Sequence, residues 1–204
     1  MTLPPPVELS HLLDSNIPEE TRDLALQNAL RIPPNPPQIT PLNSLLPSVA
    51  GSQNDPLISA FITNFIQNPP VSMHPTDLFI MTLTAISISC PLSTFPSLKI
   101  LIEKIVVGNT TTSATRIITS MSSALENAPL LEEINANANI KIDATSNKLR
   151  LLELISSTCF SQSLHPPTPT ILSTLESLLT SSDLLSVPVT FEFIVSLAEE
   201  YKTR

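Results

Sequence analysis

The chain has 204 residues and a formal net charge of −8, from 10 Lys+Arg against 18 Asp+Glu. Its basic residues are scattered and form no stripe that would neutralise phosphates, so we expect no nucleic-acid partner. Only 2 glycines accompany 21 prolines, which argues against a β-rich protein and against a glycine-rich phosphate-binding loop, because both use glycine at positive φ.

The N-terminal part, residues 1–37, is predicted to be a helix pair followed by a connector. Residues 7–13 and 18–30 can each form a helix, and the carboxylates of Glu19 and Glu20 favour the positive end of the second helix. The prolines within residues 31–37 impose an extended chain. We interpret this run as a rigid connector, with a docking peptide for a proline-recognition domain as the alternative.

Residues 38–204 are predicted to be a helical-repeat stack in which prolines mark helix starts. Proline is tolerated in the first helical turn, because that N–H has no partner within the helix and the ring already holds the helical φ. From Pro41 to Pro96 the predicted starts are 15 to 21 residues apart, which leaves room for one helix and a short loop. The predicted start prolines are Pro41, Pro56, Pro75, Pro96, Pro129, Pro169 and Pro188.

Apolar residues in this part recur every three or four positions, as on one face of a helix. Gly51 and Gly108 are placed as helix C-caps, whereas residues 134–143 are expected to be an exposed loop. The predicted stripes include Leu42, Leu45, Leu46 and Val49; Leu57, Ile58, Phe61, Ile62, Phe65 and Ile66; Leu98, Leu101, Ile102, Ile105 and Val106; Ile117, Ile118, Met121 and Leu125; Leu149, Leu152, Ile155 and Cys159; Ile171, Leu172, Leu175, Leu178 and Leu179; and Phe191, Ile194, Val195 and Ala198.

Helices at nearly constant spacing with short loops predict antiparallel neighbours. A pair of such helices takes about 40 residues, which is the length of armadillo and HEAT repeats. We therefore predict an all-α fold of stacked antiparallel helix pairs, an armadillo/HEAT-like right-handed solenoid.

The sequence contains no motif that points to catalysis, a metal or a cofactor. Cys159 and His165 are the one Cys/His pair close in sequence, but the thiol falls on an apolar helix face, which disfavours a catalytic dyad. Neighbouring glutamates, as at 132–133 and 199–200, point about 100° apart on a helix and indicate a solvated surface. We expect a protein-binding scaffold and no enzyme. A structural subunit of a larger complex and an enzyme with an unrecognised helical site remain the alternatives.

The expected compartment is the cytoplasm, or the cytoplasm and nucleus, because residues 1–6 lack the basic and apolar regions of a signal peptide. The most apolar run, residues 78–90, is interrupted by Thr and Ser and is shorter than the about 20 residues of a membrane helix. We expect no membrane partner. Cys90 and Cys159 are predicted to be buried, reduced thiols.

Partner-binding residues are predicted at two places in the stack. Lys99 and Glu103 belong to a central helix, and Glu192, Phe193 and Glu199 belong to the final one. The apolar residues of residues 191–197 leave that final helix little polar surface, although the end of a repeat stack needs one. This predicts self-association, or a partner, at the C-terminal helix.

One segment order resembles a known family. The stretch Ser123-Ala-Leu-Glu-Asn-Ala-Pro-Leu-Leu-Glu-Glu-Ile134 is followed by a leucine-rich helix at 148–157 and by residues 173–183 before a final Phe/Ile/Val helix. This layout, over about residues 110–200, is similar to the HEAT-repeat chaperone family of the proteasome regulatory particle, whose fungal members also carry a mismatch-repair label. The resemblance implies a concave face that grips the C-terminal domain of one base ATPase during assembly.

Overall fold

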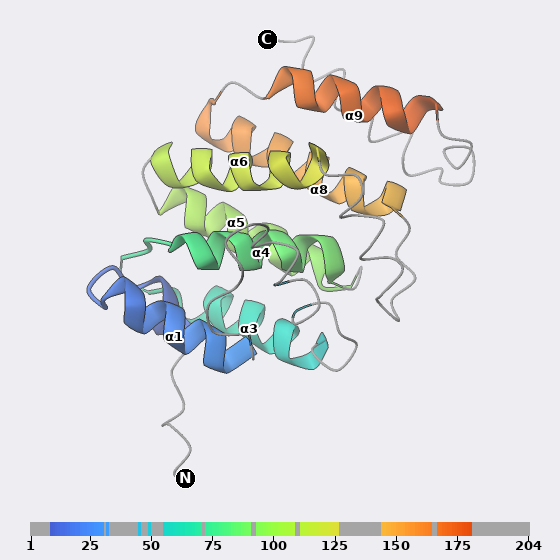
Figure 1. Ribbon diagram of the computed structural model, residues 1–204. Helices are drawn as coiled ribbons and strands as arrows, with labels where there is room; N and C mark the ends of the chain where they lie inside the picture. Colours follow the sequence, from blue (N-terminus) through green and yellow to red (C-terminus); the bar gives the residue numbers. More distant parts are fainter. Residues whose placement is uncertain are drawn as a thin grey trace.

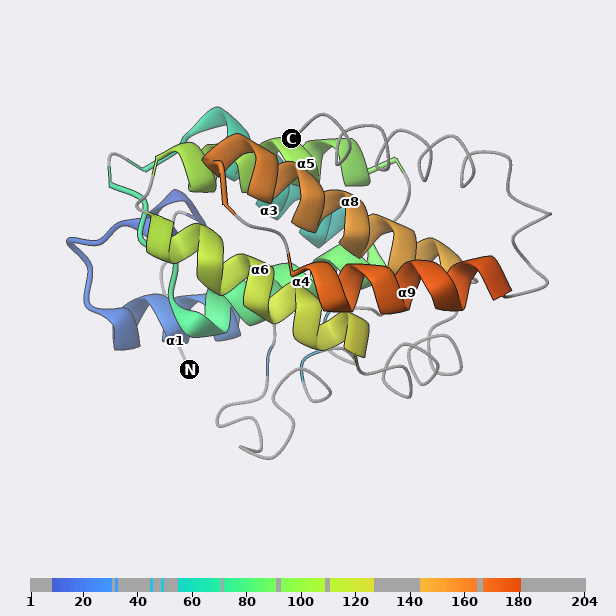
Figure 2. The ribbon, with the colours of Figure 1, turned by 90° about the horizontal axis from the view of Figure 1, so that it is seen from above.

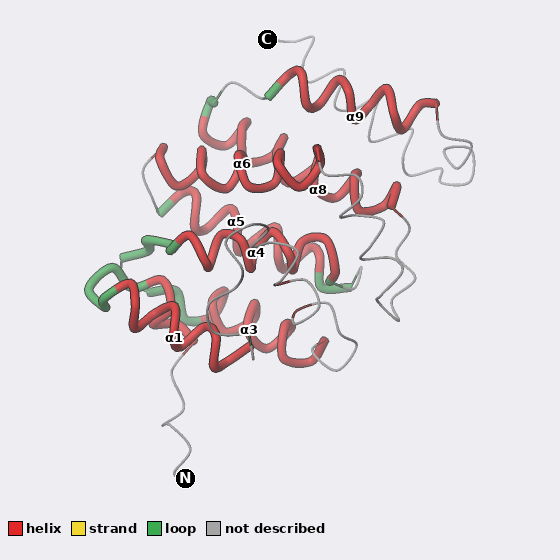
Figure 3. Tube along the Cα trace, in the orientation of Figure 1, coloured by secondary structure: helices red, strands yellow, loops and turns green. Residues whose placement is uncertain are grey.

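The computed structural model describes residues 9–30, 32, 45, 49, 55–70, 72–90, 93–108, 111–126, 144–164 and 167–180. Every regular element in this part of the chain is a helix (Figure 3), so the predicted all-α class is confirmed for it. None of these helices is long and apolar enough to cross a membrane. The elements are the 3-10 helix η1 (Leu9–Leu13) and the α-helices α1 (Glu19–Leu30), α3 (Asp55–Gln67), α4 (Asp77–Ser89), α5 (Phe95–Val107), α6 (Thr111–Glu126), α8 (Ala144–Gln162) and α9 (Thr168–Thr180).

The helices form two rows (Figure 1). In one row α1, α4, α6 and α9 contact each other in that order, and in the other row α3, α5 and α8 do the same. The rows pack together through α4 with α8, α5 with α6 and α8 with α9. Seen from above, α3 and α5 lie on one side and α1, α4 and α6 on the other (Figure 2). From α3 onward the labelled helices therefore alternate between the two rows.

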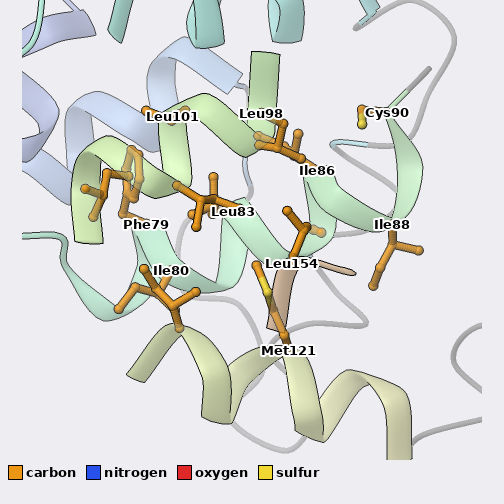
Figure 4. Close-up of a cluster of buried hydrophobic side chains, with 14 of the residues drawn as sticks. Phe79, Ile80, Leu83, Ile86, Ile88, Cys90, Leu98, Leu101, Met121 and Leu154 are labelled. Atoms are coloured by element: carbon orange, nitrogen blue, oxygen red, sulfur yellow. The ribbon is translucent and has the colours of Figure 1, made fainter. Parts of the chain in front are cut away.

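The core is one cluster of buried side chains, mostly aliphatic, with an aromatic group between α3 and α4. Phe61 and Phe65 of α3 meet Phe79 of α4, with ring centroids 4.9 to 5.8 Å apart and two of the three contacts edge-to-face. Figure 4 shows α4 between α5, which supplies Leu98 and Leu101, and α6. Helix α4 is thus one of the helices that pack against both rows.

The apolar run at residues 78–90 is a helix buried on nearly every side. Its polar residues Thr82, Thr84, Ser87 and Ser89 are 0 to 2% exposed. Each of their hydroxyls donates a hydrogen bond to the backbone carbonyl four residues earlier. The helix satisfies its own buried hydroxyl groups in this way, so it can pack against apolar neighbours all round.

The proline rule holds at three of the predicted starts and is wrong at one. Pro56, Pro96 and Pro169 each occupy the second position of a helix. Pro75, however, precedes the N-cap of α4, which is Thr76; the Thr76 hydroxyl accepts a hydrogen bond from the Phe79 N–H. The helix starts later than predicted because a side-chain cap, and not the proline, satisfies its first amides.

The predicted stripes of α5 and α6 are buried, and so are Ile58, Phe61, Ile62 and Phe65 of the α3 stripe, whereas Ile66 is partly buried. In α8, Leu149 is half-buried, and in α9, Leu172 is 59% exposed although Ile171 beside it is buried. Gly108 is the C-cap of α5, as predicted, but with φ at −77°. It therefore does not use the left-handed conformation that usually favours glycine there. Both cysteines are buried and free, as expected.

Several predictions fall on residues outside the described ranges. These are the extended run at 33–37 and the domain boundary at 37/38, the loop at 134–143, the C-cap at Gly51, and the helix predicted to start at Pro188. The helix starts predicted at Pro41 and Pro129 also lie outside the described residues. Leu45 and Val49, both predicted on one stripe, are described, and they are helical and buried.

Backbone hydrogen bonds join the segment that precedes α1 to the segment that precedes α4. An isolated antiparallel bridge joins Asp14 to Met73, and the His74 N–H donates to the Leu13 carbonyl at 2.7 Å. Ser15 and Ser72 add two more hydrogen bonds, one from the Ser15 N–H to the Ser72 carbonyl and one between their hydroxyls. We call residues 13–15 and 72–76, together with Arg22, Asp23 and Arg116, the N-terminal junction.

Two arginines hold the N-terminal junction from opposite sides. Arg22 of α1, which is 6% exposed, donates to the carbonyl of His74. Arg116 of α6 donates to the carbonyl of Pro75 at 3.2 Å and pairs with the carboxylate of Asp77. The segment that leads into α4 is therefore hydrogen-bonded to α1 and to α6, the two helices that flank α4 in its row.

Asp23 of α1 completes the junction by accepting a hydrogen bond from the Thr76 hydroxyl at 2.6 Å. Burial raises the pKa of the Asp23 carboxyl, the Thr76 hydrogen bond lowers it, and the nearby Glu19 raises it further, so that the pKa lies above its ordinary value. The folded chain thus holds this proton more tightly than the unfolded chain. The stabilising effect is complete below pH 3.8, the ordinary value, and is lost as the pH rises through the raised pKa.

Asp23→Asn is therefore expected to raise the melting temperature at neutral pH, because it removes a carboxylate that burial disfavours while leaving an oxygen to accept from Thr76. Below pH 3.8 both chains carry a neutral side chain here, and the difference should approach zero. Thermal unfolding followed by circular dichroism at both pH values checks this. A lower melting temperature for the variant at neutral pH would contradict it.

Candidate protein-binding face

One side of α5 points away from the core and carries Pro96, Ile100, Glu103 and Val107, all exposed. We call these four residues the α5 outer face. Ile100 is 45% exposed and Val107 is 74% exposed, which makes them two of the most exposed large apolar side chains in the described part of the chain. The opposite side of the helix is the buried stripe, whose members are Leu98, Leu101, Ile102, Ile105 and Val106.

The two lysines of α5 are used within its own row. Lys99 Nζ lies 2.9 Å from Glu153 Oε1 of α8, and both side chains are 34% exposed. Lys104 Nζ donates to the backbone carbonyl of Ile66 in α3 at 2.6 Å. An ion pair this exposed adds little to stability, and the two contacts connect α5 to α3 and α8 at the edges of their apolar packing.

Glu103 is the acidic residue of the α5 outer face. Within the described ranges it makes no ion pair, whereas Glu153 on the neighbouring helix is neutralised by Lys99. The face therefore combines two exposed apolar side chains with one carboxylate that has no counter-charge there. Such a face is complementary to a partner whose binding surface is apolar and carries a positively charged side chain.

Of the predicted site residues, the structure places Lys99 and Glu103 together on the outward half of α5. Their functional role stays a prediction. Glu192, Phe193 and Glu199 lie outside the described residues. Ile100 and Val107 were not predicted, although they fall in the gaps of the predicted α5 stripe, and an apolar residue in such a gap is a signal for an exposed apolar site.

Two polar side chains, Arg150 and Asn147, are buried in the first half of α8. Arg150 is 5% exposed, donates to the Cys90 carbonyl at 2.6 Å and stacks over the Phe95 ring at 5.5 Å. One turn earlier, Asn147 is 0% exposed, and neither atom of its amide has a hydrogen-bond partner among the described residues. Arg150 locks α8 to the end of α4 and the start of α5, whereas Asn147 weakens the same packing.

The Cys159 thiol is the side chain that the sequence raised as a nucleophile. It is 1% exposed, and burial raises its pKa to about 11. A thiol with this pKa is almost entirely protonated near neutral pH and reacts slowly. His165, its proposed base, lies outside the described residues.

Across the residues that the structure describes, no three acidic, histidine or cysteine side chains come together in a way that would hold a metal ion.

Comparison with known proteins gives no match. No family model, no curated protein and no solved structure matches the chain.

Proposed function

We propose that the chain is a non-enzymatic protein-binding scaffold, built as an armadillo/HEAT-like right-handed solenoid of helix pairs. Three features of the described helices support this arrangement. Successive helices alternate between two rows, each helix packs on the next member of its row, and the rows are held together by direct contacts. In such stacks, extended faces made of one row are the usual binding surfaces.

The observation that carries the proposal is the α5 outer face. It lies in the middle of its row, where the Lys99–Glu153 and Lys104–Ile66 contacts link α5 to its two neighbours. Apolar side chains on a packed helix lose less conformational entropy when they bind a partner than those on a mobile segment do. Ile100 and Val107 would supply the apolar contact, and Glu103 would select the partner by charge.

The family resemblance of residues 110–200 suggests what the partner is. We propose that the scaffold acts as an assembly chaperone and grips the C-terminal domain of one ATPase of the proteasome base. This assignment is narrower than the scaffold itself, and the two are tested by different outcomes of one experiment.

The experiment is affinity capture of the full-length tagged chain from cells, followed by mass spectrometry. We expect one stoichiometric partner that is retained by Leu172→Asp, a matched control on α9, and lost with Ile100→Asp. A base ATPase recovered without the complete proteasome would support the chaperone role.

Other results separate the readings. A different stoichiometric partner would keep the scaffold and remove the proteasome assignment, and recovery of a complete stable complex would favour a structural subunit. Absence of any stoichiometric partner would reject the scaffold.

A further inference from the structure

We propose that the α5 outer face also binds the same face of a second copy of this chain, with the two α5 helices antiparallel about a two-fold axis beside Glu103 and Lys104. The proposal rests on the proposed function in one respect, that this face is a binding surface. It differs in naming the occupant, which is argued from the order of side chains along α5.

A two-fold contact places each residue of one copy opposite a fixed residue of the other, and the relation is reciprocal. With the axis between positions 103 and 104, Ile100 faces Val107 of the second copy and Glu103 faces its Lys104. Both apolar side chains of the face, 45% and 74% exposed in the single chain, are then covered together. Lys99 comes opposite Gly108, which has no side chain to obstruct it.

The neighbouring register is disfavoured by charge. If the axis lay between positions 101 and 102, Ile100 would face Glu103 of the second copy and Lys99 would face its Lys104. That arrangement sets a carboxylate against an apolar side chain and opposes two like charges, which disfavours association. The side-chain order of α5 therefore favours one of these two registers.

Glu103 gains in the paired state the counter-charge that the described part of the single chain does not give it. Lys104 can provide this charge without giving up its present contact, because an ammonium group has three donors and one of them is used on the carbonyl of Ile66. The Lys104 side chain is half-buried, so part of it remains accessible from outside the chain.

Self-pairing has a direct consequence for partner binding. A copy bound through α5 hides Ile100, Glu103 and Val107, so that a partner protein that uses this face must displace it. The chain would then expose its apolar side chains only in exchange for a partner.

Sedimentation velocity of the full-length chain, from low micromolar to several hundred micromolar concentration, tests the pairing. The unmodified chain should shift from monomer to dimer as concentration rises. Ile100→Ser and Val107→Ser should each raise the concentration of half-dimerisation about tenfold or more, because they remove apolar contacts at the centre of the interface. Leu172→Ser, at a 59% exposed apolar site on α9, should leave it unchanged.

The charge pair allows a stricter test. Glu103→Lys and Lys104→Glu should each weaken the dimer, because each opposes like charges across the axis. Mixing the two variants in equal amounts should restore the dimer. In the mixed dimer, each of the two contacts across the axis pairs a lysine of one variant with a glutamate of the other. Melting temperatures measured on the same samples verify folding, and Glu103→Lys, which breaks no contact among the described residues, keeps the test valid if Lys104→Glu is unstable.

A chain that remains monomeric at the highest concentration overturns the pairing. So does a dimer that all α5 variants retain, which would place the contact elsewhere, as at the predicted C-terminal helix. If the chain is monomeric and yet Ile100→Asp loses a captured partner, the proposed function stands and this inference is wrong. If the dimer depends on α5 but no partner is captured, this inference stands and the proposed function is wrong.

Discussion

Replacing Phe79 with alanine is expected to lower the free energy of unfolding by about 3–5 kcal/mol, the usual range for a buried aromatic side chain. Phe79 is 1% exposed, and its ring lies 5.8 Å from that of Phe61 and 5.5 Å from that of Phe65. The substitution removes apolar burial and two ring contacts and leaves a cavity between α3 and α4. Because domains are commonly stable by about 5–15 kcal/mol, the variant should lose a large share of its stability.

Urea unfolding followed by circular dichroism is the suitable measurement, since the chain has no Trp and only 1 Tyr. Phe79→Leu, which keeps most of the volume, should lose about 1.5 kcal/mol or less. Leu172→Ala on the exposed side of α9 should change stability by no more than about 0.5 kcal/mol. Equal losses for Phe79→Ala and Leu172→Ala would show that the aromatic group does not stabilise the core.

Asn147→Leu is expected to change stability in the opposite direction, by raising the free energy of unfolding by about 1–3 kcal/mol. The Asn147 side chain is 0% exposed, and its amide has no hydrogen-bond partner in the described part of the chain. A buried polar group without a partner loses its hydrogen bonds to water and gains none in return, and the expected range is the size of that penalty. Leucine has a similar shape and carries no such penalty.

The same urea measurement tests this, with two controls. Asn28→Leu, on an exposed position of α1, should have almost no effect. Asn147→Asp has nearly the same shape but introduces a buried charge, and it should destabilise the chain at neutral pH and recover as the pH falls. If Asn147→Leu proves destabilising, the amide makes a stabilising contact with a partner beyond those described.

Local rules in the sequence account for most of the helices. Periodic apolar residues located α3, α5 and α6, and proline located the first turns of α3, α5 and α9, because both signals depend only on the helix itself. The start of α4 was misplaced at Pro75 for a different reason. There the cap is Thr76, and its orientation depends on Asp23, which is 53 residues away in sequence.

The candidate site shows the same division. A helical period is enough to place Lys99 and Glu103 on the outward half of α5. It does not reveal that Lys99 is held by Glu153, because that contact spans 54 residues and depends on how α8 packs on α5. Asn147 gave no signal, since a single polar residue in a helix is usually exposed and its burial follows from neighbours outside its own segment.

The N-terminal junction also determines the order in which the chain can fold as it is made. The hydroxyls of Ser15 and Ser72 that meet there are separated by 57 residues. At a synthesis rate of about 5–20 residues per second, the first of them waits roughly 3 to 11 s for its partner to be made. During that interval the buried side of α1, including Leu26 and Leu30, has no α4 to cover it. Helix α1 is thus secured only after α3 and the start of α4 have been made, and until then it is open to the chaperones that bind nascent chains.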